Sequence, residues 1–250
     1  MHMPAHEPVE QLFAGLIGEQ YELLKIICPA APDMSRRLGE RVATCPAAPE
    51  PLSVLEIGCG TGITSIALLN GRDDMRLTAL DSEPTMLNQA RRNLARWVEQ
   101  GRLKLIEQDA LSVLRSLPDA GFDGVASAYT LHNFFDSYRT DVLAEILRIL
   151  KPGGWFVNGD RYAVDDVREH CRLTQEEMRV YFCELSRLQR YDVLEQWIVH
   201  LYGDECPDRI MRLAPSLETM RALGYVGVAV EYRDGVNALV TAGKPFLKNS

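Results

Sequence analysis

The sequence lacks the cysteine and histidine patterns that mark metal centres and disulfide frameworks. Its six cysteines and five histidines contain no C-x-x-C pair and no paired spacing between the two residue types. Zinc sites and disulfide-stapled folds depend on such spacings. We therefore expect reduced, mostly buried thiols and no metal site.

Long apolar runs and an excess of basic charge are missing as well. No run of about eighteen apolar residues occurs, and the start Met1-His2-Met3-Pro4 lacks a basic region followed by an apolar stretch. We expect neither a membrane span nor a secretion signal, and we expect a cytoplasmic location. The formal charge is −8, from 27 basic and 35 acidic residues, and no local patch reverses it. This balance argues against nucleic acid as a partner.

The chain does contain alternating strand and helix signals. With 250 residues, of which 46% are hydrophobic, it can bury one α/β domain with helical additions. We expect an N-terminal helical arm over 1–50 and a core over 51–250, with a helical insert at about 161–213. The patterns predict strands near 53–57, 76–81, 103–107, 122–127 and 155–160, helices near 64–70, 84–99, 110–116 and 138–149, and a terminal hairpin over 226–232 and 236–242.

The strongest local signal is an apolar strand that runs into a turn of three glycines, with the sequence SVLEIGCGTG over residues 53–62. Glycines at alternate positions let the backbone adopt positive φ and lie close to a ligand. Helical residues follow from Thr64, so free N–H groups of a helix N-terminus favour a carboxylate or phosphate at the same place. A dinucleotide-binding turn needs G-x-G-x-x-G, and Ile63 stands where its third glycine would be. The spacing therefore disfavours a dinucleotide oxidoreductase.

Together with Glu56, this turn resembles the glycine-rich motif of class I S-adenosylmethionine-dependent methyltransferases. The resemblance is to a small-molecule branch with an N-terminal helical arm and a helical insert after the fifth strand. It implies a Rossmann-like fold with a seven-stranded, mostly parallel sheet, one antiparallel strand and accessory helices. The other elements that match the family, in the expected order, are Met75–Leu80 with Asp81, Leu103–Glu107 with Asp109, Phe122–Ser127 and Leu150–Trp155.

The resemblance implies S-adenosylmethionine as cofactor and S-adenosylhomocysteine as product. Glu56 is expected at the amino-acid end of the cofactor, directly or through water, Asp81 at the ribose hydroxyls and Asp109 at the adenine amino group. Helix capping by Asp81 is compatible with its ribose role, whereas Asp109 stays open between adenine recognition and a helix cap. The predicted cofactor-binding residues are Tyr21, Glu56, Gly58, Cys59, Gly60, Thr61, Gly62, Asp81, Ser82, Met86, Asp109, Ala110, Ser127 and Tyr129.

The acceptor site is predicted at the residues that follow the fourth and fifth strands, because ligands of open α/β sheets bind at the carboxyl edge. His132 and Asp160 are the predicted catalytic residues, since a near-neutral pKa suits His132 to act as a general base. Two alternatives stay open: His132 packs beside the cofactor without proton transfer, or Asp160 simply pairs with Arg161. The predicted substrate-binding residues are Tyr129, His132, Asn133, Phe134, Arg161 and Tyr162.

Two segments lie outside the minimal core. Apolar positions over 8–42 predict amphipathic helices, and the capping-box spacing at Thr174 predicts one long aromatic-bearing helix before Gly203. We interpret Tyr181, Trp197 and His200 as core or interface residues of that helix and not as pocket walls. The exposed apolar faces of these helices predict a homodimer.

The predicted reaction is an in-line transfer of a methyl group to a small, aromatic or amphipathic metabolite. One alternative is an enzyme similar to carboxy-S-adenosylmethionine synthase, which needs a cationic clamp for the added carboxylate. Only Arg209 is available for that clamp in the segment before Ile210, and it is poorly placed. A second alternative is a non-catalytic protein that binds S-adenosylmethionine.

Overall fold

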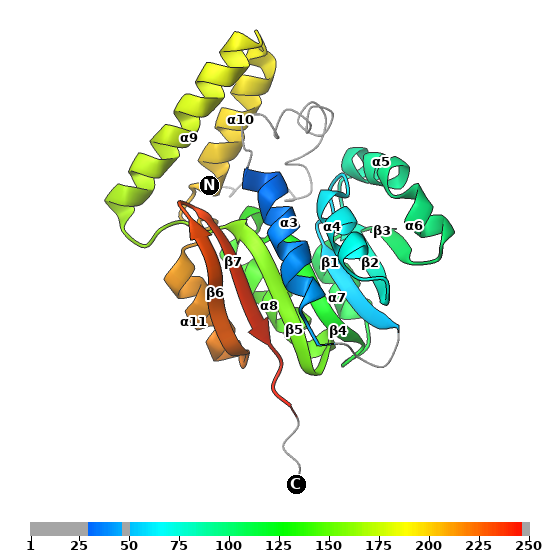
Figure 1. Cartoon of the computed structure of the whole chain (residues 1–250). Coiled ribbons are helices and arrows are strands. Elements are labelled where there is room, and N and C mark those ends of the chain that lie inside the picture. Colours follow the sequence, from blue (N-terminus) through cyan, green and yellow to red (C-terminus); the bar gives the residue numbers. More distant parts are fainter. Residues whose placement is uncertain (1–29, 47–50, 247–250) are drawn as a thin grey trace, which may run out of the picture.

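The computed structural model describes residues 30–46 and 51–246, which form one sheet with helices on both faces (Figure 1). The seven strands have the order β3-β2-β1-β4-β5-β7-β6. The predicted fold class is therefore confirmed. The strands are β1 (Leu52–Ile57), β2 (Met75–Asp81), β3 (Leu103–Glu107), β4 (Phe122–Ala128), β5 (Leu150–Arg161), β6 (Val226–Asp234) and β7 (Asn237–Gly243).

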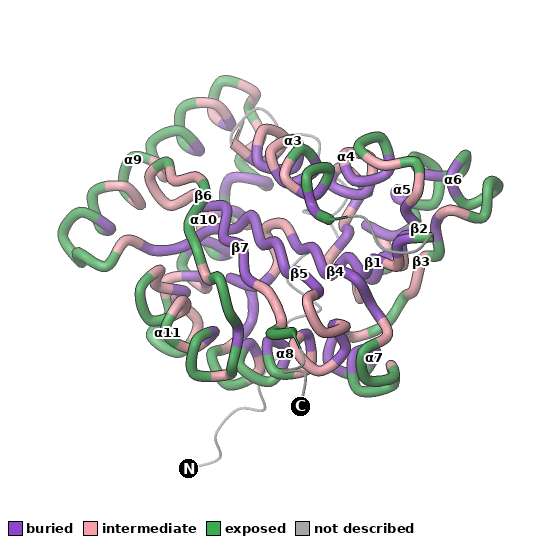
Figure 2. Tube along the Cα trace, turned by 60° about the horizontal axis from the view of Figure 1, so that its bottom comes forward, coloured by how far each residue is buried: buried purple, intermediate pink, exposed green. Residues whose placement is uncertain are grey.

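The helices form two layers, and apolar side chains from each layer pack against the sheet. Figure 2 shows the buried trace running along the central strands, with exposed turns on the outer helices. One layer contains α3 (Ala30–Ala43), α4 (Ile63–Gly71), α5 (Pro84–Asn93) and α6 (Ala95–Glu99). The other contains α7 (Ala110–Ser116), α8 (Asp136–Ile149) and α11 (Leu213–Leu223).

The sheet is parallel except for β7, which runs antiparallel to both β5 and β6. The predicted terminal hairpin is present, and its turn contains Gly235 at φ 53°. Because the carboxyl ends of the parallel strands meet at one edge, the residues that follow β1, β2, β4 and β5 come together there.

The prediction of one continuous helix over 84–99 is wrong. Pro84 does stand in the first turn of α5, where Glu83 caps the helix by accepting from Thr85 N. The chain leaves helical geometry at Leu94, which has φ −109° and ψ 7°, and α6 then begins. Leu94 is fully buried, so packing of this side chain accompanies the break.

The predicted long helix after the fifth strand is two helices, α9 (Val167–Arg187) and α10 (Tyr191–Asp204). Gln189 has φ 56° between them, which a continuous helix does not allow. The first of the two, α9, begins before the predicted cap at Thr174, because Asp166 caps it by accepting from two backbone N–H groups. The pair projects as a hairpin beyond the carboxyl edge of the sheet (Figure 1). The short helix α11 carries no sequence prediction of its own.

The described part of the N-terminal arm, α3, packs on the sheet through Met34, Leu38 and Val42. The predicted helical content of residues 8–29, including Tyr21, lies outside the described residues. Within 30–46 and 51–246, no helix combines the length and the apolar character that a membrane span requires.

Candidate functional site

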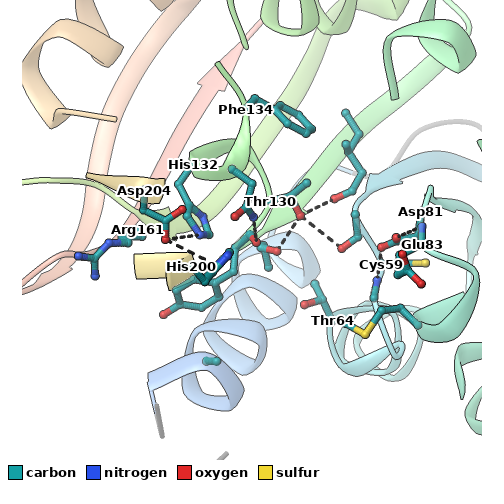
Figure 3. A pocket seen from close by; sticks show the side chains of 18 of the residues that line it. Cys59, Thr64, Asp81, Glu83, Thr130, His132, Phe134, Arg161, His200 and Asp204 are labelled. Atoms are coloured by element: carbon teal, nitrogen blue, oxygen red, sulfur yellow. Dashed lines mark hydrogen bonds and ion pairs between the residues drawn. The ribbon is translucent and has the colours of Figure 1, made fainter. Parts of the chain in front are cut away.

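A cavity of about 360 Å³ opens at the carboxyl edge of the sheet. Its size falls within the range of about 300–1,000 Å³ that is usual for small-molecule sites. The loops after β1, β2 and β4, the end of β5 and the hairpin α9–α10 all contribute walls. Figure 3 shows two groups of polar side chains in this cleft: Asp81 and Glu83 at one end, and His132, His200 and Asp204 at the other.

The glycine turn has the geometry that its spacing predicts. Gly58, Gly60 and Gly62 have φ angles of 72°, 53° and 94°, values that side chains disfavour. A Cβ added to Gly58 would lie 2.0 Å from Thr130 Oγ1, so the turn packs directly under the loop after β4. Gly58, Gly60, Cys59 and Thr61 line the cleft, whereas Gly62 lies behind them as the N-cap of α4.

The Glu56 side chain is fully buried beneath this turn and does not form a wall of the cleft. One of its oxygens accepts from Ser65 Oγ at 2.5 Å. The other, Oε1, has no hydrogen-bond partner among the described residues. Burial raises the pKa of Glu56 to about 7, and the Ser65 hydrogen bond opposes this shift.

Asp81 ends β2 and lines the cleft beside the glycine turn. Its two oxygens accept from Gly60 N at 2.8 Å and from Glu83 N at 2.9 Å. Burial raises its pKa, although these N–H donors favour the ionised form. The carboxylate therefore fixes the turn and still faces the cavity, together with Ser82 and Met86.

Asp109 lines the same end of the cleft and also caps α7. Its side chain accepts from Ser112 N at 2.8 Å and from the hydroxyl of Tyr138. Ala110 follows in the wall. Capping is thus observed, and a further role in adenine recognition stays a prediction.

His132 and Asp160 form a buried pair at the other end of the cleft. His132 lies in η2 (Leu131–Asn133), and its Nδ1 is 2.6 Å from Asp160 Oδ1. Asp160 also accepts from the backbone N–H groups of Leu131 and Arg161, at 2.9 and 2.8 Å. Burial disfavours the protonated ring of His132, but Asp160 outweighs this effect and raises the pKa of His132.

The guanidinium of Arg161 does not pair with Asp160. It hydrogen-bonds to Glu177 and, at 2.9 Å, to Glu205, because β5 ends under α9 and the end of α10. The alternative of a simple pair between Asp160 and Arg161 is therefore wrong.

Besides Glu56, the predicted site residues that lie in the core and do not line the cleft are Asp160, Tyr162 and Ser127. The Tyr162 side chain is fully buried, and its hydroxyl accepts from Asn158 Nδ2 at 2.8 Å. Ser127 is also fully buried and donates to Ile57 O. Alternation along a strand explains both, since neighbouring residues point to opposite faces. Tyr129, Asn133 and Phe134 do line the cleft.

Tyr181, Trp197 and His200 are walls of the cleft, so the interpretation that they are not pocket walls is wrong, although Tyr181 and Trp197 also belong to a buried apolar cluster as expected. All three come from the α9–α10 hairpin and, together with Asp204, line the end of the cleft that holds His132. His200 and Asp204 stand four residues apart, which places them on one helix face. This spacing was the sequence signal that could have identified them as a pair of site residues. Burial lowers the pKa of His200.

The comparisons with known proteins agree with this geometry. A family model described as a methyltransferase domain matches residues 54–154. A demethylmenaquinone methyltransferase of Deinococcus radiodurans is 34% identical over 152 residues, which cover 60% of this chain and 59% of that protein. Residues 54–154 therefore form a methyltransferase domain, and the fold of the chain is the one that S-adenosylmethionine-dependent methyltransferases share.

Solved structures of this methyltransferase fold cover nearly the whole chain. PigF with S-adenosylhomocysteine has a TM-score of 0.65 at 17% identity and covers 96% of this chain and 63% of that one. The cyclase SpnF has a TM-score of 0.60 at 17% identity and covers 92% and 96%. These likenesses concern the fold. The sequence matches span 43 to 62% of the length of the first curated relatives.

Proposed function

We propose that this methyltransferase carries a methyl group from S-adenosylmethionine to a small aromatic acceptor. The observation that carries the proposal is the arrangement of one cleft. The glycine turn and Asp81 lie at one end, and the His132–Asp160 pair lies at the other.

The cofactor end suits a nucleoside with a charged amino-acid tail. The glycine turn lets the backbone approach the ligand closely, and the Asp81 carboxylate at the end of β2 can accept from ribose hydroxyls. Glu56 lies beneath the turn, and its Oε1 has no hydrogen-bond partner within the described ranges, in line with a cationic ammonium group reached through water.

The acceptor end suits a flat ring whose nucleophile must lose a proton. Phe134, Tyr181 and Trp197 supply aromatic walls. Methyl transfer from a sulfonium needs alignment of nucleophile, methyl carbon and sulfur. His132 is the group placed to activate the nucleophile, and the buried Asp160 positions it, so His132 remains our catalytic candidate with Asp160 as its positioning residue.

The alternative of carboxy-S-adenosylmethionine synthesis is less well supported. Arg161 lines the cleft, but Glu177 and Glu205 already bind its guanidinium. Arg209 lies over the ring of Phe135, at 4.5 Å from its centroid. Arg161 is thus already paired with two carboxylates, and Arg209 is not part of the cleft wall, so neither is placed to bind an added carboxylate.

Labelled S-adenosylmethionine tests the proposal. The protein is incubated with methyl-labelled cofactor, a metabolite extract and a panel of phenols and quinols, and products are identified by mass spectrometry. We expect label in a low-mass aromatic product and equal formation of S-adenosylhomocysteine. His132→Gln should lower turnover by about 100-fold and keep S-adenosylhomocysteine affinity.

The matched control is His170→Gln. His170 is buried and lies 2.6 Å from Glu205 through Nε2, but it is not part of the cleft wall. Its substitution should leave turnover within about threefold of wild type. Tight cofactor binding without transfer to any low-mass acceptor would instead favour a non-catalytic binding protein.

The homodimer and the cytoplasmic location remain predictions. Phe182 on α9 and Tyr202 on α10 are 50% and 65% exposed, which supports self-association through this hairpin. Light scattering at micromolar concentration should give twice the monomer mass, and Tyr202→Glu should return it to the monomer.

A further inference from the structure

Three side chains at the acceptor end of the cleft converge without closing a hydrogen bond between them. His200 Nε2 and His132 Nε2 lie 3.6 and 3.9 Å from the same oxygen, Oδ2 of Asp204. Hydrogen bonds between nitrogen and oxygen are about 2.7–3.2 Å long. One ligand atom from each residue lies within 4.8 Å of the others, and Figure 3 shows the three side chains together.

The group is buried and is held by two separate elements. His132 and His200 are each 8% exposed, and Asp204 is 6% exposed. His200 and Asp204 stand four residues apart on α10, and η2 supplies His132. Two ligands at this spacing on one helix face are typical of metal-binding helices.

Asp204 lacks a full set of partners. Its second oxygen, Oδ1, is buried and has no hydrogen-bond partner among the described residues. The nearby cation of Arg161 is bound by Glu177 and Glu205. A buried carboxylate that is only partly satisfied is costly, so this position favours an added cation.

His132 has the support that metal-binding histidines usually have. Its Nδ1 is hydrogen-bonded to the Asp160 carboxylate at 2.6 Å, which leaves Nε2 directed away from that carboxylate as the ligand atom. We propose that His132, His200 and Asp204 bind one divalent transition-metal ion, such as Zn²⁺, Fe²⁺, Mn²⁺ or Co²⁺, at the acceptor end of the cleft.

The donor set fits this class of ion. Two imidazole nitrogens and one carboxylate oxygen suit these metals, and such a set leaves coordination positions open. With metal–ligand bonds of about 2.0–2.2 Å, ligand atoms stand roughly 3–3.5 Å apart. The two separations from Asp204 Oδ2 are 3.6 and 3.9 Å, and all three ligand atoms lie within 4.8 Å of one another, so binding requires the side chains to close by about 1 Å.

The site narrows the class of acceptor, and this step rests on the proposed function. Open positions that face an aromatic-walled cavity suit an acceptor with two adjacent oxygens, such as a catechol or an enol beside a carbonyl. In this arrangement His132 activates the acceptor as a ligand of the ion and not as a free base, and binding to the ion favours loss of the hydroxyl proton to solvent. The acceptor's electron pair then forms the bond to the methyl carbon while the carbon–sulfur bond breaks, and that bond's electrons stay on sulfur in S-adenosylhomocysteine.

Cobalt binding tests the site without reference to activity. The full chain, free of any affinity tag and treated with a chelator, is titrated with Co²⁺ and followed by visible absorption. We expect one Co²⁺ per chain, a ligand-field spectrum and displacement by Zn²⁺. His200→Gln and Asp204→Asn should each weaken binding by about 100-fold. His170→Gln, a buried histidine outside the group, should bind as wild type does.

Unchanged S-adenosylhomocysteine affinity verifies that each variant is folded. Absence of a Co²⁺ spectrum in wild type, or equal affinity in Asp204→Asn, overturns the metal site. Full-rate methylation by the chelated protein overturns the ion's part in activation and leaves methyl transfer standing. Co²⁺ binding through these residues without methylation of any acceptor, with or without the ion, overturns the proposed function and leaves the metal site standing.

Discussion

A fully buried carboxylate lies behind each end of the cleft, and the two carboxylates differ in how many hydrogen bonds the protein gives them. Asp160, at the acceptor end, accepts from two backbone N–H groups and bonds the ring of His132. Glu56, under the glycine turn, accepts one hydrogen bond, and its other oxygen has no partner among the described residues. Asp160 is thus complete before any ligand arrives, whereas Glu56 is suited to a charge that a ligand brings.

The same difference runs through the rest of each end. Consecutive residues after β1 form most of the proposed cofactor end, and the positive φ angles of their glycines determine its shape. The acceptor end is assembled from side chains of η2, β5, α9 and α10, which are far apart in the sequence. We therefore expect a single substitution at one end to change the binding of one ligand and to leave the binding of the other unchanged.

The largest effect is expected at Gly58. Gly58→Ala places a Cβ 2.0 Å from Thr130 Oγ1 at a residue with φ 72°, so the turn must move away from its ligand. We expect S-adenosylhomocysteine affinity to fall by about 1,000-fold, or about 4 kcal/mol, as measured by calorimetric titration.

Gly101→Ala is the matched control for this experiment. Gly101 has φ 67°, and no atom lies within 4 Å of an added Cβ. Its substitution carries the same backbone strain without the clash, and affinity should stay within about twofold of wild type. Equal losses in both variants would mean that backbone strain anywhere in the fold lowers the affinity, and not the clash at the glycine turn.

The second prediction concerns Glu56 and pH. Its pKa is about 7 in the folded protein against 4.5 as the ordinary value. The folded state therefore holds more protons than the unfolded state between these values, and stability falls as pH rises from 4.5 to 7. Full burial makes this worth about 3 kcal/mol. Glu56→Gln should remove that fall, as measured by urea unfolding at pH 5 and pH 8.

Glu107→Gln is the control for the pH experiment, because the Glu107 side chain is 41% exposed at the end of β3. It should keep the wild-type dependence of unfolding free energy on pH. The prediction fails if the free energy of unfolding changes between pH 5 and pH 8 by the same amount in the wild type and in Glu56→Gln. The pKa of Glu56 would then not be raised in the folded protein.

The third prediction tests the charge at the end of β2. Asp81→Asn removes the charge and one acceptor oxygen from the cleft, and charged hydrogen bonds are worth about 1.5–3 kcal/mol. We expect S-adenosylhomocysteine affinity to fall by about 20-fold. Asp73→Asn, at a fully exposed side chain, should leave the affinity unchanged. An Asp81→Asn protein with wild-type affinity would limit Asp81 to fixing the glycine turn.

The sequence predicted the geometry of the glycine turn well because the signals for it are local. Strand, glycine spacing and the acid after β2 lie within about thirty residues of sequence, and the backbone geometry follows from residue type at Gly58 and Gly60. Glu56 shows the limit even there, since the motif marks the residue but not its depth beneath the turn.

The acceptor end was harder to predict for a physical reason. Periodicity identifies the apolar face of a helix, but it does not say whether that face meets the core or a cavity. Tyr181 and Trp197 do both: they pack with each other and also line the cleft. The break at Gln189 folds α10 back along α9, and no residue at that break has the usual turn chemistry.

The smallest effect is expected at Tyr181, where the acceptor end can be altered without touching the cofactor. Its hydroxyl donates to Glu177 Oε1 at 2.8 Å. Tyr181→Phe keeps the ring and frees Glu177, which also binds Arg161. We expect KM for the acceptor to rise by about threefold, in line with about 0.5–1.5 kcal/mol for one neutral hydrogen bond, with S-adenosylhomocysteine affinity unchanged.

Tyr191→Phe supplies the control, because Tyr191 begins α10 with 62% of its surface exposed. Tyr191→Phe should change neither KM for the acceptor nor the affinity for S-adenosylhomocysteine. If Tyr181→Phe weakened S-adenosylhomocysteine binding as much as acceptor binding, the two ends would be coupled through the α9–α10 hairpin. Since Tyr181 and Asp81 come from elements on opposite sides of the cleft, independent responses are the expected outcome.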